Sequence, residues 1–452
     1  MEIEEAREVF LSGIDPIMDR SSLSPVQEMV PLEKAAGRIL AENVTASFPV
    51  PHFSKSAMDG YAVRAEDIRE ASREKPAVLR VLYERLAGDL PEEEKNLPAE
   101  GRNLPAQAEG LAQTAVRIMT GAALPEGYDA VVRQEDTDYG EKEVRVFASV
   151  PAYRNICRKG EDIEEGSSVL LSGSRIGRVE AGVLASLGTG EVPVLRPVRV
   201  HILSTGSELL EPGEAWDNDR VDAGERHGRR REQREASVLQ SGTEKKCPPA
   251  GKIFSSIPYA LMAGLSGGCF SVRMEICPDE PEALIQALSV ALECADIVIT
   301  TGGVSVGKKD LLPDILDRVG AKKLFSGVNV QPGTPTIGSV KDGIPILSLS
   351  GNPYAALVNF DLYFWHAAAK LTGCLAFLPR TLHGVMGEDY PKKNRLRRLL
   401  RAEEREGCIY LPAESHASSV IGNLLGCNCY IDLPAETSLK KGDVVRIIRM
   451  AE

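Results

Sequence analysis

A repeated pattern in the second half of the chain, an apolar segment ending in a loop of small residues, most constrains the fold. The three instances are Val198–Leu203 before Ser204-Thr205-Gly206, Ala295–Thr300 before Thr301-Gly302-Gly303, and Ile344–Leu349 before Ser350-Gly351-Asn352. Helical patterns lie between these segments, at Tyr259–Leu265, Pro281–Glu293 and Leu311–Val319. Alternating strands and helices are typical of a parallel sheet with helices on its faces. The sequence therefore predicts an α/β domain.

The three small-residue loops are candidates for a binding site. In an open parallel sheet, ligands bind at the carboxyl ends of the strands. Glycine lets a backbone approach a ligand closely, and a helix that follows points its N–H groups and positive dipole at the loop. Three such loops in one sheet predict a crevice for a phosphate or a phosphorylated cofactor. The alternative is that the glycines only turn the chain.

Two acidic residues stand beside the predicted crevice. Glu208 follows the first loop, and Asp310 follows the second. Carboxylates near a phosphate can hold Mg²⁺. The alternative makes both residues first-turn helix residues, which the helix dipole favours. Spacing alone leaves both interpretations open.

The rest of the chain predicts a helical start and several β-rich stretches. Helical spacing marks residues 3–10 and again 26–32, with Pro25 and Pro31 near the expected helix starts. One further helix is expected at Val179–Leu187. The expected strands are Val78–Tyr83, Ala115–Met119, Ala130–Val132, Glu141–Ala148 and, in a small C-terminal β domain, 444–449.

Two polar stretches interrupt these patterns. Residues 84–112 are expected to form a surface loop, and residues 211–250 a flexible insertion. The second stretch contains an arginine-rich run at 229–235 that could suggest RNA binding. Glutamates interleave with these arginines, so a solvated loop is the favoured interpretation.

Charge and composition exclude several functional classes. Acidic residues outnumber basic ones by 65 to 53, which argues against a nucleic-acid carrier. The chain has no uninterrupted apolar run of about 18 residues, so we expect no membrane span. Its start lacks the pattern of a signal peptide. Nine scattered cysteines fit reduced thiols in a cytoplasmic protein.

The segment Ser56-Ala57-Met58-Asp59-Gly60-Tyr61-Ala62-Val63-Arg64 has a single acid among small residues. By its residues alone it favours a tight Asp-Gly turn. It also resembles the hallmark of the MoeA/gephyrin E-domain family, the molybdopterin molybdenumtransferases. Further segments resemble family motifs in the same order along the chain: Arg117–Pro125 with Gln134-Glu135, Arg158–Asp162, Ser204–Leu209, Thr301–Gly307 with Asp310, Ser350–Pro353 and the end from Ser418 to Arg449.

The resemblance implies a multidomain α/β plus β subunit in four parts. These are a discontinuous N-terminal domain (1–48 and 148–196), a β-rich inserted domain (49–147), a parallel-sheet α/β molybdopterin-binding domain (197–375) and a C-terminal β-barrel-like domain (376–452). It also implies a homodimer with active sites at the subunit interface. Molybdopterin adenylyltransferase and molybdoenzymes are the implied protein partners.

The implied reaction inserts molybdate into adenylylated molybdopterin and releases AMP, with a divalent metal such as Mg²⁺. By matching motifs, Asp59, Thr120, Glu208 and Asp310 form the implied catalytic cluster, and Asp59, Glu208 and Asp310 are the implied metal ligands. The implied cofactor-binding residues are Thr205, Gly206, Gly302, Gly303, Ser305, Gln331, Thr334, Ser350, Gly351 and Asn352. The choice between molybdenum and tungsten stays open.

The sequence departs from the family near this implied site. Where the family commonly has Lys-Pro-Gly-Lys-Pro, this chain has Gln331-Pro332-Gly333-Thr334-Pro335, and Ser255-Ser256-Ile257 stands for Asp-Ser-Asn. Ser207 and Ser54 replace two further acids. Neutral residues hydrogen-bond an oxyanion but supply no charge. Lys308 and Lys309 are candidate replacements. The alternative function is a non-catalytic carrier or assembly protein that binds molybdopterin.

Overall fold

A computed structural model describes residues 1–17, 26–89, 111–213, 248–304, 311–412 and 417–450. The chain forms two compact units. The larger unit comprises Met1–Glu42, Ser172–Arg178 and Glu191–Glu452, and the smaller unit comprises Asn43–Leu171 and Val179–Gly190. Most of both predicted polar stretches, and Ser305 and Lys308–Asp310, lie outside the described residues. The four-part division stays a prediction.

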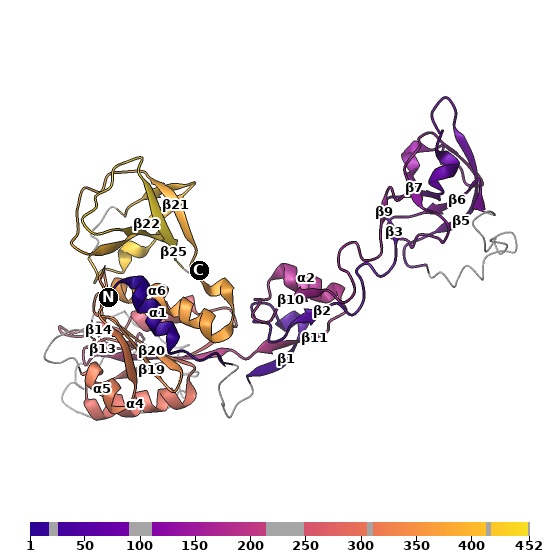
Figure 1. Cartoon of the computed structure of the whole chain (residues 1–452). Coiled ribbons are helices and arrows are strands. Elements are labelled where there is room, and N and C mark those ends of the chain that lie inside the picture. Colours follow the sequence, from indigo (N-terminus) through magenta and orange to yellow (C-terminus); the bar gives the residue numbers. More distant parts are fainter. Residues whose placement is uncertain (18–25, 90–110, 214–247, 305–310, 413–416, 451–452) are drawn as a thin grey trace. The chain divides into compact units, whose positions relative to one another are not determined.

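The larger unit is built on a six-stranded mixed sheet (Figure 1). Its order is β15 (Phe270–Cys277), β12 (Val198–Thr205), β16 (Ile297–Thr301), β20 (Ile344–Leu349), β19 (Ile337–Lys341) and β17 (Lys322–Ser326). The first four strands run parallel; β19 pairs antiparallel with β20, and β17 pairs antiparallel with β19 and so runs in the direction of the first four. The predicted α/β class and its three strands are confirmed. The sequence interpretation missed β15, β19 and β17.

Helices cover both faces of this sheet (Figure 1). On one face, α4 (Pro281–Cys294) and α5 (Leu312–Arg318) enclose a core with Leu203, Val298 and Ile346. On the other face, α1 (Ile3–Ser12), α3 (Ile257–Gly264) and α6 (Pro353–Thr372) pack on alternate side chains of the same strands. Since strand residues alternate in direction, strands covered on both faces read as continuous apolar runs.

Helix α6 is the longest element and is buried on nearly all sides. Its start is set by Asn352 at the N-cap and Pro353 at the first helical position. Its end is set by Gly373, which adopts the left-handed conformation at φ 73°. Aromatic residues fill its length, and Tyr354 in its first turn packs near Tyr430 of the C-terminal domain, 6.4 Å between ring centroids. The helix thus fixes the C-terminal domain to the sheet.

The predicted helical start is only half right. Helix α1 is confirmed, but 26–32 does not form a helix. Instead β1 (Gln27–Pro31) pairs antiparallel with β11 (Glu191–Leu195). The partner lies about 160 residues away in sequence, so a local helical period could not reveal it. Pro31 ends the strand and is also the N-cap of a short 3-10 helix, η2 (Leu32–Lys34), so it does lie at a helix start as expected.

A closed five-stranded β-barrel forms the C-terminal part. Its strands are β21 (Thr381–Met386), β22 (Arg397–Arg405), β23 (Cys408–Tyr410), β24 (Cys429–Leu433) and β25 (Val444–Arg449). The order β22-β23-β21-β25-β24 closes because β24 also pairs with β22. Inside lie Met386, Leu400 and Ile431. The predicted barrel-like domain and its final strand are confirmed. A sixth strand, β18 (Val330–Gln331), joins β22 in parallel from outside the barrel.

The smaller unit contains a five-stranded sheet. Its order is β7 (Ala130–Arg133), β4 (Gly60–Val63), β6 (Thr114–Ile118), β5 (Ala77–Arg85) and β8 (Glu143–Val146). All four strands predicted here form. Two short pairs accompany it, β2 (Val44–Thr45) with β10 (Ser168–Leu170) and β3 (Lys55–Ser56) with β9 (Ile156–Cys157). Helix α2 (Arg178–Ser186) matches its prediction within one residue.

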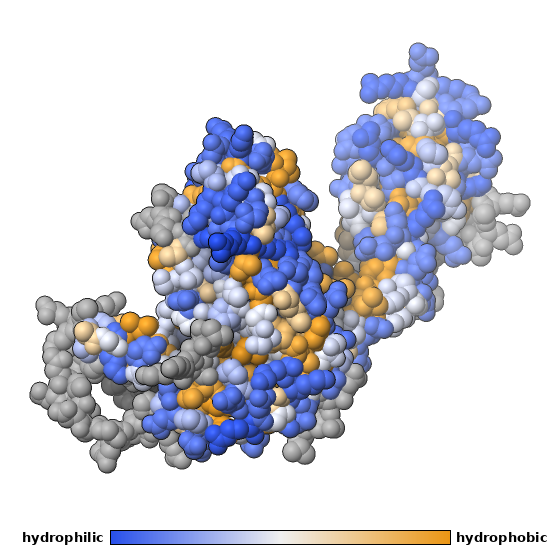
Figure 2. All heavy atoms as spheres, turned by 60° about the vertical axis from the view of Figure 1, so that its left-hand side comes forward, coloured by the Kyte–Doolittle hydropathy of each residue, from blue (hydrophilic) through white to orange (hydrophobic). Residues whose placement is uncertain are grey.

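Among the described residues, no helix combines the length and the apolar character needed to cross a bilayer. Figure 2 shows hydrophilic side chains over most of the visible face. The eight cysteines that the structure describes are all free thiols, and Cys247 lies outside the described residues.

Candidate functional site

The carboxyl ends of β12, β16 and β20 lie side by side. These strands are consecutive neighbours in the sheet, with Ser204 opposite Thr301 and Thr301 opposite Leu349. The three small-residue loops therefore leave the sheet at one edge. A ligand site at this edge requires that adjacency, and phosphate binding there stays a prediction.

Glycine is required where the second loop passes its neighbours. Gly302 has φ 93°, and its N–H donates to the Leu349 carbonyl at 3.0 Å. A Cβ added to Gly302 would lie 2.5 Å from the Thr205 carbonyl oxygen. A Cβ added to Gly351 would lie 3.6 Å from the Gly302 Cα. The three loops are thus packed backbone against backbone, and their main chains form a floor at this edge of the sheet.

Hydroxyl groups at the strand ends stabilise this floor. The Ser204 and Thr301 hydroxyls hydrogen-bond each other at 2.9 Å, and the Thr205 hydroxyl donates to the Thr301 carbonyl at 3.3 Å. All three residues are buried. Thr205, expected to bind cofactor, acts in this structure as a link between β12 and β16.

Glu208 lies in a turn over the first loop. Its two carboxylate oxygens would each be 2.8 Å from a Cβ placed on Gly206, so the carboxylate folds back over that glycine. The Leu209 N–H donates to Gly206 at 3.1 Å, and β13 (Leu209–Leu210) follows. Because a strand follows Glu208, the alternative that it is a first-turn helix residue is wrong.

A cavity of about 360 Å³ adjoins the third loop. The start of α6 contributes Ser350, Asn352 and Ala355 to its wall. The remaining lining residues are Gln331, Pro332, Gly333, Thr334, Pro335, Arg398, Ala417 and Ser418. Four of the expected cofactor-binding residues, Gln331, Thr334, Ser350 and Asn352, therefore line one cavity. The N-terminal dipole of the 20-residue helix α6 favours an anion there.

Arg401 holds one wall of this cavity in place. It is fully buried and donates to the carbonyls of Ala417 and Val420, each at 2.7 Å. Its guanidinium also lies 3.7 Å from the Tyr354 ring centroid. Tyr354 in turn donates its N–H to Ser418 at 3.0 Å. These contacts fix the 417–420 segment against the start of α6.

Arg398 is a lining residue that the sequence interpretation missed. It lies on β22, directly opposite Gln331 of β18. The sequence shows a cluster of arginines at 395–401, but strand register alone decides which of them reaches the cavity. That register depends on pairing between residues 67 positions apart.

The smaller unit carries Asp59 and Thr120. Thr120 donates its N–H and its hydroxyl to the same Asp59 oxygen, each at 2.7 Å. These bonds, the backbone one first, lower the pKa of Asp59 below its usual range. Asp59 does lie in the expected turn, between β3 and β4. Its carboxylate is also ionised and paired with the other residue that the family motifs imply.

The expected carboxylates have suitable chemistry for Mg²⁺, which prefers oxygen ligands. Asp59 belongs to the smaller unit and Glu208 to the larger, while Asp310 lies outside the described residues. Over the described ranges, no group of three or more His, Cys, Asp or Glu side chains is gathered closely enough to hold a metal ion.

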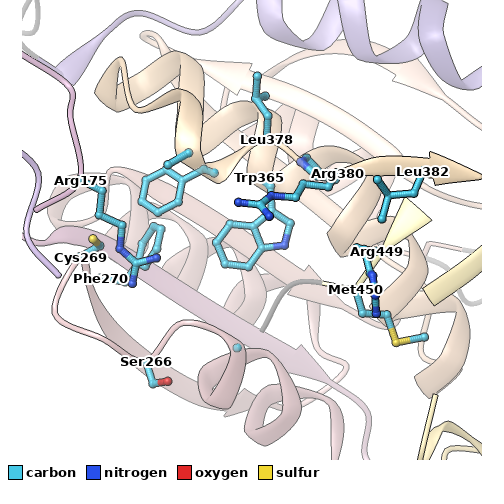
Figure 3. A pocket seen from close by; sticks show the side chains of 14 residues that line it. Arg175, Ser266, Cys269, Phe270, Trp365, Leu378, Arg380, Leu382, Arg449 and Met450 are labelled. Atoms are coloured by element: carbon cyan, nitrogen blue, oxygen red, sulfur yellow. The ribbon is translucent and has the colours of Figure 1, made fainter. Parts of the chain in front are cut away.

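A second cavity, of about 490 Å³, opens elsewhere in the larger unit (Figure 3). Figure 3 shows Phe270 and Trp365 among its lining side chains, together with Arg175 and Arg380. Phe270 begins β15 opposite Val198, the first residue of β12. The cavity therefore lies at the amino ends of these strands, away from the edge where the three loops meet.

These features define a class: an α/β protein in which three small-residue loops meet at adjacent strand ends, with an appended β-barrel. Three family models match the chain: "MoeA N-terminal region (domain I and II)" over residues 1–188, "Probable molybdopterin binding domain" over 201–368, and "MoeA C-terminal region (domain IV)" over 383–450.

Curated relatives and solved structures agree with these models. The chain is 33% identical to a molybdopterin molybdenumtransferase of Staphylococcus epidermidis, covering 92% of this chain and 90% of the relative. A Staphylococcus aureus protein of the same name is 32% identical, covering 96% and 94%. The crystal structure of the molybdopterin biosynthesis MoeA protein from Pyrococcus horikoshii matches 99% of both chains with a TM-score of 0.75 at 26% identity. The chain belongs to the MoeA family of molybdopterin molybdenumtransferases.

Proposed function

We propose that this chain inserts molybdenum into adenylylated molybdopterin and releases AMP. The observation that supports this most directly is the meeting of three small-residue loops at adjacent strand ends, beside a cavity at the start of α6. The crevice suits the phosphates of a pterin nucleotide, because it offers backbone groups and a helix N-terminus. The cavity suits molybdate, a tetrahedral oxyanion and the second substrate.

The pterin nucleotide is assigned to the crevice. Gly206, Gly302, Gly303 and Gly351 allow its close approach, with Ser305, Ser350 and Asn352 as hydrogen-bonding side chains. Thr205 supports this floor from below through its bond to Thr301. Molybdate is assigned to the cavity, where Gln331 and Thr334 face the start of α6.

Four polar residues are assigned to the reaction itself. Asp59, Thr120, Glu208 and Asp310 form the proposed catalytic cluster, and the three carboxylates among them are the proposed ligands of Mg²⁺. Bound there, Mg²⁺ would neutralise phosphate charge and polarise the phosphoanhydride that releases AMP. Thr120 keeps the Asp59 carboxylate ionised and oriented through its two hydrogen bonds.

The organisation implied by the family belongs to the same proposal. The active protein is a cytoplasmic homodimer of four-part subunits, with boundaries at residues 48, 148, 196 and 375. Its sites lie at the subunit interface. A molybdopterin adenylyltransferase supplies the substrate, and molybdoenzymes receive the product.

The test is an AMP-release assay. Purified protein is incubated with adenylylated molybdopterin and Mg²⁺, with and without molybdate, and both AMP and molybdenum cofactor are measured. We expect both products to depend on molybdate. Absence of AMP at ample protein concentration overturns the proposal.

The neutral residues Gln331 and Thr334 favour a second candidate, a molybdopterin-binding carrier. A carrier would bind the pterin nucleotide tightly in calorimetry, without dependence on molybdate and without AMP release. Calorimetry of nucleotide binding and the AMP-release assay therefore distinguish a carrier from a transferase.

A further inference from the structure

We propose that Arg398 supplies the positive charge that holds the oxyanion in the cavity beside α6. The inference rests on the proposed function, because molybdate is the oxyanion concerned. It assigns a specific role to a barrel residue, whereas Gln331 and Thr334 contribute only neutral groups.

Strand register places Arg398 at the cavity. β18 and β22 pair in parallel, with Val330 opposite Arg397 and Gln331 opposite Arg398. Directly paired residues project from the same face of a sheet, so Gln331 and Arg398 share one face. Both line the cavity. A lysine at 331 would stand beside the Arg398 guanidinium, and like charges in paired positions destabilise a sheet. A neutral residue at 331 is therefore compatible with an arginine at 398.

Two neighbouring arginines of β22, Arg397 and Arg401, make contacts away from the cavity. Arg397 forms ion pairs with Asp432 at 2.7 Å and Glu4 at 2.8 Å. Arg401 is fully buried against the carbonyls of Ala417 and Val420. Arg398 is half-buried, and its Nη1 donates to Asn394 Oδ1 at 2.9 Å, which steadies the side chain. Of these three arginines, only Arg398 lines the cavity.

The rest of the cavity suits an oxyanion. The described lining residues include no acidic side chain and offer the Ser350 hydroxyl with the N-terminus of α6. The Thr334 hydroxyl donates to the Val330 carbonyl at 2.7 Å and so has no proton left for an oxyanion. A guanidinium presents paired N–H donors that match two oxygens of a tetrahedral oxyanion, which a lysine ammonium cannot do. Partial burial weakens screening by salt and strengthens the attraction. Arg398 thus supplies the positive charge for the bound oxyanion that no residue of the loop Gln331–Pro335 provides.

The experiment compares Arg398→Gln with Arg395→Gln, a matched change at an exposed arginine three residues away that does not line the cavity. Calorimetry measures molybdate binding to the full chain without pterin nucleotide. We expect Arg398→Gln to weaken molybdate binding at least tenfold and Arg395→Gln to leave it unchanged within twofold. In the AMP-release assay, Arg398→Gln should raise the half-saturating molybdate concentration by a similar factor, with nucleotide affinity unchanged.

Two further variants test whether the lost affinity comes from the lost charge and not from a disrupted structure. Arg398→Lys keeps the charge but not the paired donors, and should fall between the wild type and Arg398→Gln. Adding Gln331→Lys to Arg398→Gln returns a cation from the opposite strand and should recover at least half of the lost affinity. Unchanged molybdate affinity in Arg398→Gln, or equal losses in the 395 and 398 variants, overturns the inference.

The outcomes also separate this inference from the proposed function. Molybdate binding that depends on Arg398, without AMP release, removes the transferase proposal and keeps the oxyanion site. AMP release with an unchanged molybdate requirement in Arg398→Gln keeps the transferase and removes the role of Arg398. A wild-type protein that binds no molybdate overturns the role of Arg398.

Discussion

One oxygen of Asp59 accepts two hydrogen bonds from Thr120, from its N–H and from its hydroxyl, each at 2.7 Å. Replacing Thr120 by valine removes only the hydroxyl bond. We expect the pKa of Asp59 to rise toward its usual value and AMP release to fall about tenfold, since charge-assisted hydrogen bonds orient the carboxylate. Thr120→Ser keeps the hydroxyl and should keep most of the activity. Equal activity in the valine and serine variants would contradict this role.

Gly302 tests whether the crevice floor needs a close backbone approach. An alanine there adds a Cβ 2.5 Å from the Thr205 carbonyl oxygen and must adopt φ 93°. The strained conformation alone costs about 1–2 kcal/mol. We expect Gly302→Ala to lower the midpoint of thermal unfolding and to weaken binding of the pterin nucleotide. Gly351→Ala, whose Cβ would meet Gly302 Cα at an ordinary 3.6 Å, is the control for stability. Equal unfolding midpoints in both variants would refute the packing argument.

The buried carboxyl group of Asp361 should make the stability of the protein depend on pH. Burial in α6 raises the pKa of Asp361 to about 6, even though Trp365 Nε1 and the Tyr430 hydroxyl donate to it at 3.0 and 2.8 Å. The folded state therefore keeps a proton that the unfolded chain, with a pKa near 4, has lost. Its contribution to stability is full below pH 4, falls as the pH rises to 6 and is constant above that. The slope is at most about 1.4 kcal/mol per pH unit.

Asp361→Asn should remove this dependence, because asparagine carries no titrating proton. The measurement is urea unfolding between pH 4.5 and 7.5, followed by tryptophan fluorescence. The wild type should lose stability relative to the variant between pH 4.5 and 6. A constant difference between the two proteins across this range would show that Asp361 does not titrate there.

The ion-paired carboxylate of Asp296 should stabilise the protein at neutral pH and lose this effect in acid. Burial opposes ionisation, but hydrogen bonds from Arg196 and Arg199 outweigh it and lower the pKa of Asp296 to about 2. Its stabilisation is thus present above pH 4 and is lost as the pH falls toward 2. Asp296→Asn leaves two arginines without their carboxylate and should cost about 3 kcal/mol at pH 7. Urea titrations at pH 7 and pH 3 check this: the cost should shrink at the lower pH.

Strands with strong local signals were predictable from the sequence. The apolar runs that became β12, β16 and β20 are buried on both sides, so their composition alone revealed them. β15 carries exposed positions and sits at the sheet edge, which weakens its apolar pattern. The helical spacing at 26–32 predicts a helix where β1 forms, because the strand's partner β11 is remote in sequence. Pairing that depends on distant residues is the information that local periodicity lacks.

The residues of the candidate site also differ in whether local sequence could reveal them. Gly302 and Asp59 could be found from their motifs, since each occupies a turn whose residues are adjacent in sequence. Arg398 could not, because its place at the cavity follows from the register of two strands in different parts of the larger unit. Glu208 was found, but the sequence left open whether it begins a helix. The strand that follows it settled that question.

The pairing of β18 with β22 bears on how this protein could be engineered. Gln331 lies in the stretch matched by the molybdopterin-binding domain model (201–368), whereas Arg398 lies in the stretch matched by the C-terminal model (383–450). A chimaera that joins this α/β part to the barrel of a relative lacking the arginine would have no cation at the junction. The reciprocal chimaera, with a lysine on the loop, would have two. Barrels are therefore interchangeable among such proteins only when residues 331 and 398 are transplanted together.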